Sequence, residues 1–372
     1  MIKLASPNIT RREIDAVVKV LKSGTLSLGP EILRFEKAFA RYTGRKHALA
    51  VSSGTAGLHL ITRALGLKPG DEVITSPYSF AASVNCILYQ GARPVFADID
   101  PKTLNIDPRK IEAAVTPRAR AVLAVDVFGL PADYRKIQAV CKKHKLLLIE
   151  DSCEALGAKY KDKMAGSFGT ASAFGFYPNK QITTGEGGMV LTDDDRLAET
   201  MSSLRNQGRH SLGGWLAHHE MGYNYRMADI NAALGRVQLS RIKGILKTRK
   251  DIAERYLKLF QQRLPDFTVL QQPKGYQRSW FVFVALVPQE LKGSGRDRLI
   301  KHLQSKSIGC AHYFPTLHLQ PYLLELLKHK KGDFPAAEDT ADRSFAIPFH
   351  HKLTLRDQER VVQFIEQFIN YS

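Results

Sequence analysis

The sequence contains few cysteines, no long apolar run and few acidic residues relative to basic ones. Its four cysteines, Cys86, Cys141, Cys153 and Cys310, lie far apart among 372 residues and form no C-x-x-C pair. We therefore expect no disulfide scaffold and predict no metal site. No window holds 18 uninterrupted apolar residues and Pro7 interrupts the start, so we expect neither a membrane span nor a signal peptide, and a cytoplasmic location.

The shortage of acidic residues gives the chain a strong positive charge. Lys and Arg number 54 against 36 Asp and Glu, a formal net charge of +18. Such an excess is typical of proteins that bind nucleic acid, an anionic membrane surface or a phosphorylated substrate. No helix-turn-helix, zinc-finger or RNP motif accompanies the charge, so we predict no nucleic-acid or membrane partner. Composition is otherwise ordinary for a globular protein and excludes a mainly disordered chain.

Short apolar runs alternate with helical segments over about 150 residues of the first part of the chain. This alternation predicts an α/β domain with a largely parallel sheet, in which ligands bind at the carboxyl ends of the strands. Strands are expected at 47–51, 72–75, 93–98, 121–127, 146–151 and 171–176, and helices at 55–65, 79–89 and 132–144.

Two helices are predicted before the first strand. The first begins with a capping-box pattern of Thr10 and Glu13, carries an apolar stripe on one face and ends at Gly24. The second covers about 31–42. The stripe consists of Ile14, Val17, Val18 and Leu21.

The pattern changes near residue 241. A long charged helix is expected at 241–264, a strand at 279–287 and an amphipathic helix at 353–369. The sequence therefore predicts a first domain at 1–240 and a smaller α+β domain at 241–372.

Two short segments in the first domain have the composition of binding sites. Ser53, Gly54 and Thr55 lie between a strand and a helix, where backbone N–H groups can bind a phosphate or where Ser53 can simply cap the helix. Glu150 and Asp151 end an apolar strand and point to opposite faces. A buried carboxylate there needs a cationic or hydrogen-bonding partner, either a protonated pyridine nitrogen or an ordinary strand-end cap.

The most specific segment covers 172–188 and contains Lys180 followed by three glycines, Gly185, Gly187 and Gly188. A strand runs here into a polar, glycine-rich segment that carries one lysine. A lysine held in a site can form a Schiff base with an aldehyde cofactor, and glycines allow close backbone approach.

Together these segments resemble the DegT/DnrJ/EryC1/StrS family of sugar aminotransferases, which use pyridoxal 5'-phosphate (PLP) and have the aspartate-aminotransferase-like fold. The resemblance covers nearly the whole chain and implies fold type I, with a large PLP-binding domain and a mostly parallel central sheet. The matching segments, in order, are 27–36, 53–55, 150–151, 176–188, 222–229 and 313–321.

The resemblance implies a role for individual residues. Lys180 would hold PLP as a Schiff base and move a proton, and Asp151 would pair with the pyridine nitrogen so that the ring acts as an electron sink. Phe80 would stack on the ring. Asn224 would reach the phosphate in the neighbouring subunit, which implies a homodimer with a shared active site. The phosphate site would include Ser53, Gly54 and Thr55, and the sugar-nucleotide site Gly29, Arg226, Tyr313 and His318.

Two positions depart from the family pattern. Glu154 stands near the expected phenolic oxygen of the cofactor, where Gln or His is common, and an acid there is unfavourable unless it is protonated or turned away. Gly175 stands where a phosphate-binding Ser is usual, so we expect phosphate binding to depend more on Thr55 and Asn224.

The resemblance implies an aminotransferase that moves an amino group from L-glutamate, by way of pyridoxamine phosphate, to a nucleotide-diphosphate-linked keto-sugar. One alternative is a related pyridoxamine-phosphate-dependent dehydratase, although those relatives carry His at the position of Lys180. Another is a nucleic-acid-binding regulator on the same fold. The sequence does not determine which sugar or which nucleotide is bound, or whether C3 or C4 of the sugar carries the ketone. We expect 208–219, with Arg209, His210, Trp215, His218 and His219, and 312–320 to set that choice.

Overall fold

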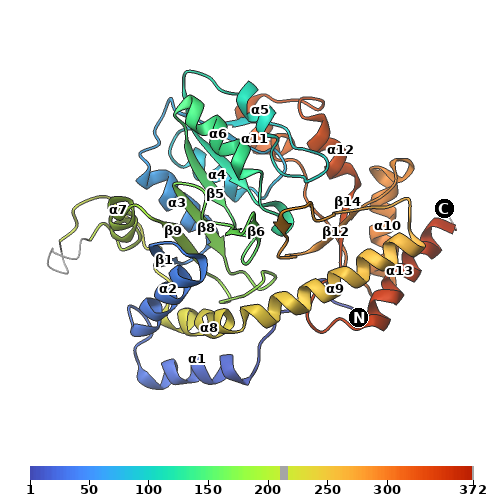
Figure 1. The fold of residues 1–372 in the computed structure, drawn as a ribbon, viewed down its shortest axis with the longest axis horizontal. Helices are drawn as coiled ribbons and strands as arrows, with labels where there is room; N and C mark the ends of the chain where they lie inside the picture. The colour runs from blue at the N-terminus through green and yellow to red at the C-terminus, as the bar shows by residue number, and fades with distance from the viewer. Residues whose placement is uncertain (210–216, 371–372) are drawn as a thin grey trace.

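The computed structural model describes residues 1–209 and 217–370 and contains a seven-stranded sheet at its centre (Figure 1). The strand order is β1-β9-β8-β5-β4-β2-β3, and only β9 runs antiparallel to its neighbours. The predicted, mostly parallel sheet is therefore confirmed, while β9 was not predicted. The strands are β1 (His47–Val51), β2 (Glu72–Thr75), β3 (Arg93–Phe96), β4 (Ala119–Val125), β5 (Leu147–Asp151), β8 (Ala171–Gly175) and β9 (Gly188–Thr192).

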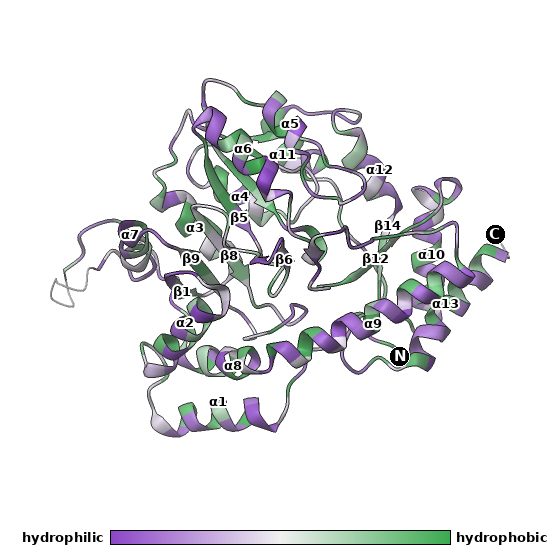
Figure 2. Cartoon of the chain, viewed as in Figure 1, coloured by the Kyte–Doolittle hydropathy of each residue, from purple (hydrophilic) through white to green (hydrophobic). Residues whose placement is uncertain are grey.

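Helices cover this sheet and connect its strands. The strands are apolar on both faces, which is typical of a parallel sheet between helical layers, and Figure 2 shows their hydrophobic colouring. The covering and connecting helices are α2 (Pro30–Thr43), α3 (Gly54–Ala64), α4 (Ala82–Leu88), α5 (Pro108–Ala113), α6 (Tyr134–His144), α7 (Asp195–Arg205) and α8 (Asp229–Ser240). The helices predicted at 55–65, 79–89 and 132–144 correspond to α3, α4 and α6.

A smaller region follows, with a four-stranded antiparallel sheet in the order β10-β12-β14-β13. Its strands are β10 (Thr268–Val269), β12 (Phe283–Leu286), β13 (Ala311–His312) and β14 (Ser344–Ile347). The helices of this part of the sequence are α9 (Ile242–Arg263), α10 (Ser294–Ser305), α11 (Pro321–Leu327), α12 (Pro335–Arg343) and α13 (Leu355–Asn370), of which α11 and α12 pack against the core of the large sheet region. A third, small sheet joins β6 (Lys159–Tyr160), β7 (Lys163–Met164) and β11 (Tyr276–Gln277). None of the described helices is both long and apolar enough to span a bilayer.

Two details differ from the sequence prediction for the smaller region. The strand expected at 279–287 is shorter, because Trp280 has a left-handed backbone with φ of 52° and β12 starts only at Phe283. The first residues of the chain also pack here, since Ile2 pairs with Ile308 and the N-terminus lies beside α9 and α13 (Figure 1). The predicted division after residue 240 assigns these first residues to the other domain.

Helix α1 (Arg11–Ser23) lies on the outside of α8 (Figure 1), and Ile14, Val18 and Leu21 of its apolar stripe are exposed. The predicted capping box is present, and Glu13 is fully buried. The Glu13 carboxylate accepts hydrogen bonds from Arg241 and Gln238, which attach α1 to α8 and to the start of α9. By contrast, Ile14 is 48% exposed and Leu21 51% exposed. The amphipathic helix was predicted correctly, but most of its predicted apolar stripe is exposed, and Glu13 and Val20 face this chain instead.

Candidate active site

A cavity of about 430 Å³ opens where the strands β4, β5 and β8 end. Their last residues, Val125, Asp151 and Gly175, line it, as the topology of an α/β sheet predicts. The start of α3 forms a second wall, and segments of the smaller region form a third. The polar side chains on its wall are Ser53, Thr55, Ser79, Asp151, Cys153, Glu154, Tyr177, Asn179, Lys180, Glu186 and Tyr313.

Lys180 enters this cavity from the turn that follows β8. Its backbone N–H donates to the carbonyl of Tyr177 at 2.9 Å, which fixes the turn. Its Nζ lies 3.4 Å from Oε1 of Glu154 and 4.0 Å from the ring centroid of Phe281. The amine is therefore held between a carboxyl group and an aromatic face, inside the cavity.

Asp151 presents its carboxylate to the same cavity and is oriented by hydrogen bonds. Oδ2 accepts from the Ser83 hydroxyl at 2.8 Å, and Oδ1 accepts from the Cys153 N–H at 3.2 Å. Ser79 bonds in turn to Ser83 at 2.8 Å. Neither serine was predicted from the sequence, although their spacing of four on a predicted helix places them on one face.

Glu150 points to the opposite face of the sheet, as the alternation of strand side chains predicts. Its carboxylate accepts the N–H groups of Gly166, Phe168 and Gly169. Burial raises the pKa of Glu150 to about 7. Of the two acids that end β5, one therefore secures a loop and the other faces the cavity.

The start of α3 forms the far wall of the cavity. Ser53 caps this helix, because its hydroxyl accepts the N–H of Ala56 at 3.0 Å. Gly54 and Thr55 begin the helix, where N–H groups have no acceptor within the helix and attract an anion. A Cβ at Gly54 would lie 2.8 Å from Sγ of Cys153 and 3.3 Å from Cα of Gly175 at the end of β8, so a larger residue would have to displace its neighbours. Both interpretations of the segment, a cap and an anion site, fit this arrangement.

Glu154 is buried and is not turned away from Lys180. Oε2 accepts the Phe128 N–H at 2.9 Å while Oε1 faces the amine. Burial raises the pKa of Glu154, and the neighbouring ammonium of Lys180 opposes that rise. The side chain is thus fixed at the position where the sequence analysis expected a conflict with a phenolate.

Aromatic side chains surround the mouth of the cavity. Phe80 lines it and keeps 65% of its surface exposed, so one face of its ring is available to a ligand. The Tyr313 hydroxyl is within 3.4 Å of Nδ2 of Asn179. Burial raises the pKa of Tyr313 above its usual value. Tyr177, Asn179 and Phe281 were missed, although the first two lie within three residues of Lys180.

Four residues predicted for the site do not line this cavity: Gly29, Asn224, Arg226 and His318. His318 is completely buried, and its Nε2 bonds to Glu338 at 3.0 Å. Gly29 precedes α2, where a Cβ would meet the Asp229 carboxylate at 2.4 Å. Asn224 is exposed, on a segment that pairs with Asn206. His318 and Gly29 thus have structural roles in this chain, whereas Asn224 faces outward.

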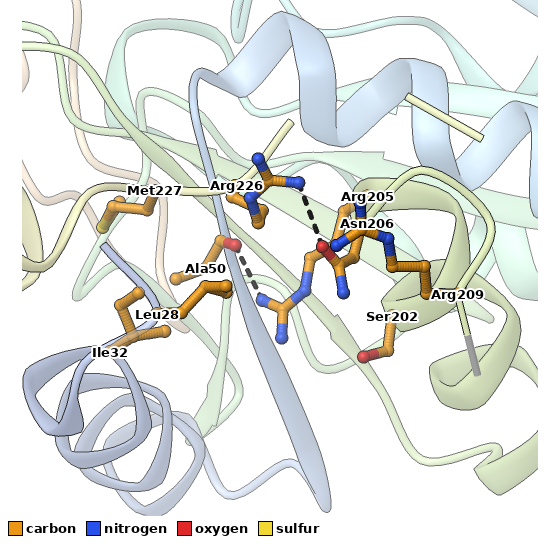
Figure 3. Close-up of a pocket in the computed structure, with 9 residues that line it drawn as sticks. All are labelled: Leu28, Ile32, Ala50, Ser202, Arg205, Asn206, Arg209, Arg226 and Met227. Carbon is orange, nitrogen blue, oxygen red and sulfur yellow. Dashed lines mark hydrogen bonds between the residues drawn. The ribbon is translucent and has the colours of Figure 1, made fainter. Parts of the chain in front are cut away.

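Arg226 lines a second cavity of about 190 Å³ (Figure 3). Its Nη1 donates to Oδ1 of Asn206 at 3.0 Å, and Arg205 donates to the Ala50 carbonyl at 2.7 Å. Burial and the nearby charge of Arg209 lower the pKa of Arg226. Three arginines, Arg205, Arg209 and Arg226, therefore line this cavity, and Arg205 is paired with Glu36. Its apolar wall consists of Leu28, Ile32, Ala50 and Met227.

The segment 208–219, which the sequence analysis connected with substrate choice, is described in part. His210 and Trp215 lie outside the described residues. His218 bonds through Nδ1 to the carbonyl of Gln207 at 2.7 Å, and the N–H of His219 donates to the carbonyl of Gly208.

The sequence is similar to those of known proteins over nearly its whole length. A model of the DegT/DnrJ/EryC1/StrS aminotransferase family matches residues 7–366. The spore coat polysaccharide biosynthesis protein SpsC of Bacillus subtilis is 40% identical over 373 residues, covering 98% of this chain and 96% of its own. GDP-perosamine synthase of Caulobacter vibrioides is 38% identical over 375 residues, covering 99% and 98%.

A solved structure agrees over the full length. Helicobacter pylori PseC, an aminotransferase involved in the biosynthesis of pseudoaminic acid, superimposes with a TM-score of 0.94 at 30% identity and covers 100% of both chains. The family match, the two relatives and the shared fold type I lead to one conclusion. The chain belongs to the DegT/DnrJ/EryC1/StrS aminotransferase family and is an aminotransferase.

Proposed function

We propose that this aminotransferase binds PLP in the 430 Å³ cavity and transfers an amino group from L-glutamate to a nucleotide-diphosphate-linked keto-sugar. The observation that carries the proposal is the convergence of Lys180, Asp151 and the start of α3 on one cavity. Relatives whose names refer to perosamine and to pseudoaminic acid support a sugar substrate. The presence of Lys180 favours amino transfer over the dehydratase alternative.

The residues on the cavity wall fit this cofactor. The first N–H groups of α3, at Gly54 and Thr55, and the Thr55 hydroxyl would hold the phosphate. Asp151 would hold a proton on the pyridine nitrogen, and the exposed ring of Phe80 would stack on the pyridine. When bound, the cofactor supplies the electron sink for the reaction. Lys180 Nζ would hold the cofactor and would take up and return the proton of the substrate carbon.

We propose that the active site is completed by a second copy of the chain. Asn224 is exposed and does not line the cavity of its own chain, so it is free to reach the phosphate in a partner. The apolar stripe of α1 continues into exposed Leu26 and Leu28, whose combined surface suits a two-fold contact.

The second cavity suits the diphosphate of the substrate. Arg226 and Arg209 concentrate positive charge there, and arginine is well adapted to bidentate phosphate binding. Tyr313 and Asn179 would contact the sugar in the first cavity. Because His318 is completely buried and Gly29 packs against Asp229, neither is among the proposed substrate contacts.

The test combines a spectroscopic step with an amino-transfer step. PLP-loaded protein should show a visible absorbance band that Lys180→Ala abolishes, while Lys163→Ala, on β7 and outside the cavity, should retain it. With nitrogen-labelled L-glutamate and a panel of nucleotide keto-sugars, mass spectrometry should find the label on one sugar. Loss of the band in the control, or a band that survives Lys180→Ala, would contradict the role of Lys180. A normal band with no labelled sugar would contradict the substrate.

A further inference from the structure

A buried arginine of the smaller region lies directly behind Lys180. Arg249 comes from α9, the long helix that runs from α8 toward α13 along one edge of the molecule (Figure 1). Its side chain is 8% exposed. Nη2 donates to the backbone carbonyl of Lys180 at 3.1 Å, and Nη1 donates to the carbonyls of Trp280 and Phe281, each at 3.1 Å.

The charge of Arg249 has no acidic partner among residues 1–209 and 217–370. All three of its hydrogen-bond acceptors are backbone carbonyls, and its guanidinium lies 5.5 Å from the Phe349 ring centroid. Burial accordingly lowers the pKa of Arg249 to about 10. A buried cation is costly to maintain, so its three simultaneous hydrogen bonds must compensate for lost hydration.

The three carbonyls belong to residues that define the position of the reactive amine. Lys180 carries that amine, and the Phe281 ring lies 4.0 Å from it. Trp280, which precedes Phe281, has a left-handed backbone with φ of 52°. This conformation is costly for a residue other than glycine, so hydrogen bonds from elsewhere in the protein are needed to hold the backbone at Trp280 and Phe281. One guanidinium therefore secures the backbones on both sides of the Lys180 side chain.

We propose that Arg249 is a positioning residue for the amino-transfer reaction, which holds Lys180 against Phe281 and joins the large sheet region to the smaller one at the cavity. Its planar fork spans three carbonyls in a fixed geometry, which the single ammonium of lysine does not reproduce. Arg249 does not contact the reacting atoms and acts through Lys180. The inference rests on the proposed function of that lysine.

The test uses Arg249→Lys, which keeps the charge, and Arg296→Lys as the matched control. Arg296 is also buried and donates to two carbonyls, of Ala341 and Ser344, away from the cavity. We expect Arg249→Lys to lower kcat by about 100-fold, the loss associated with a misplacement of about 1 Å, with KM for both substrates nearly unchanged. The circular dichroism of the bound cofactor, per unit of absorbance, should fall as the lysine loses its fixed orientation. Arg296→Lys should lower the melting temperature without either effect.

Two results would overturn the proposal. One is a wild-type kcat and dichroism in Arg249→Lys, and the other is an equal loss of kcat in Arg296→Lys at an equal loss of melting temperature. If Arg249→Lys does not fold, Phe349→Leu removes the ring beneath the guanidinium and should lower kcat about 5-fold with the same loss of dichroism. An unchanged dichroism in Phe349→Leu would then be the contradicting result. Absence of a cofactor band in the wild type would instead contradict the proposed function.

Discussion

Gly175 offers a direct way to locate the phosphate of the cofactor. It ends β8 at the cavity wall, beside Gly54 at the start of α3. A Cβ at Gly175 would lie 3.5 Å from both Cβ and Sγ of Cys153, which is ordinary van der Waals contact, and its φ is not positive. Gly175→Ser therefore introduces a hydroxyl at the proposed phosphate site without displacing the backbone.

The expected gain follows from one additional hydrogen bond to a charged group. Such a bond contributes about 1.5–3 kcal/mol, and each 1.4 kcal/mol corresponds to a factor of ten. We expect Gly175→Ser to bind PLP about 10- to 100-fold more tightly than the wild type. Gly175→Ala, which adds the Cβ without the hydroxyl, should change the affinity by less than about threefold.

The assay is a titration of the apoprotein with PLP and with pyridoxal, which lacks the phosphate. Gly175→Ser should tighten the binding of PLP and leave that of pyridoxal unchanged, because the new hydroxyl acts only on the phosphate. Equal effects on both ligands, or equal effects of the Ser and Ala variants, would refute the placement of the phosphate at the start of α3, within reach of a side chain at position 175.

Two further predictions concern assembly and pH. Leu21→Asp should dissociate the proposed dimer in sedimentation, because a two-fold contact buries the α1 stripe of both copies. Lys22→Asp, in the same turn, should leave the dimer intact. A dimeric Leu21→Asp variant would contradict the proposed interface. Asp126 accepts from Tyr134 at 2.6 Å, and burial raises its pKa to about 8. The unfolded carboxyl loses its proton near pH 4, so stability falls as the pH rises from about 4 to 8, by at most about 6 kcal/mol. Asp126→Asn should abolish this pH-dependent fall in the free energy of unfolding, measured by urea unfolding of the apoprotein. An Asp126→Asn variant that is less stable than the wild type at pH 8 would contradict the prediction.

The sheet and the main side chains of the site could be predicted because both depend on local patterns. Apolar runs that alternate with helical segments specify a parallel sheet, and strand alternation separates Glu150 from Asp151. Lys180 was found from its glycine-rich surroundings. In each case the deciding residues lie within a short stretch of sequence.

Other parts of the site depend on contacts between distant segments. Ser83 orients Asp151 across 68 residues, and Glu13 is buried only because Arg241, 228 residues later, reaches it. His318 was predicted to contact the substrate, whereas in the structure it is completely buried and bonded to Glu338, 20 residues later. No local pattern contains that information, so sequence periodicity could identify the apolar face of α1 without indicating which face meets the chain.

The role of the chain's positive charge also could not be predicted from the sequence alone. The excess of 18 suggested phosphate ligands, and the second cavity does concentrate arginines. Arg249 and Arg278 are nevertheless buried against backbone carbonyls, with Arg278 donating to those of Phe128 and Gln271. Burial lowers the pKa of Arg278 to about 9. Because these cations stabilise irregular backbone around the cavity, part of the positive charge supports the proposed site rather than contacting a phosphate, so net charge alone does not predict the number of phosphate contacts.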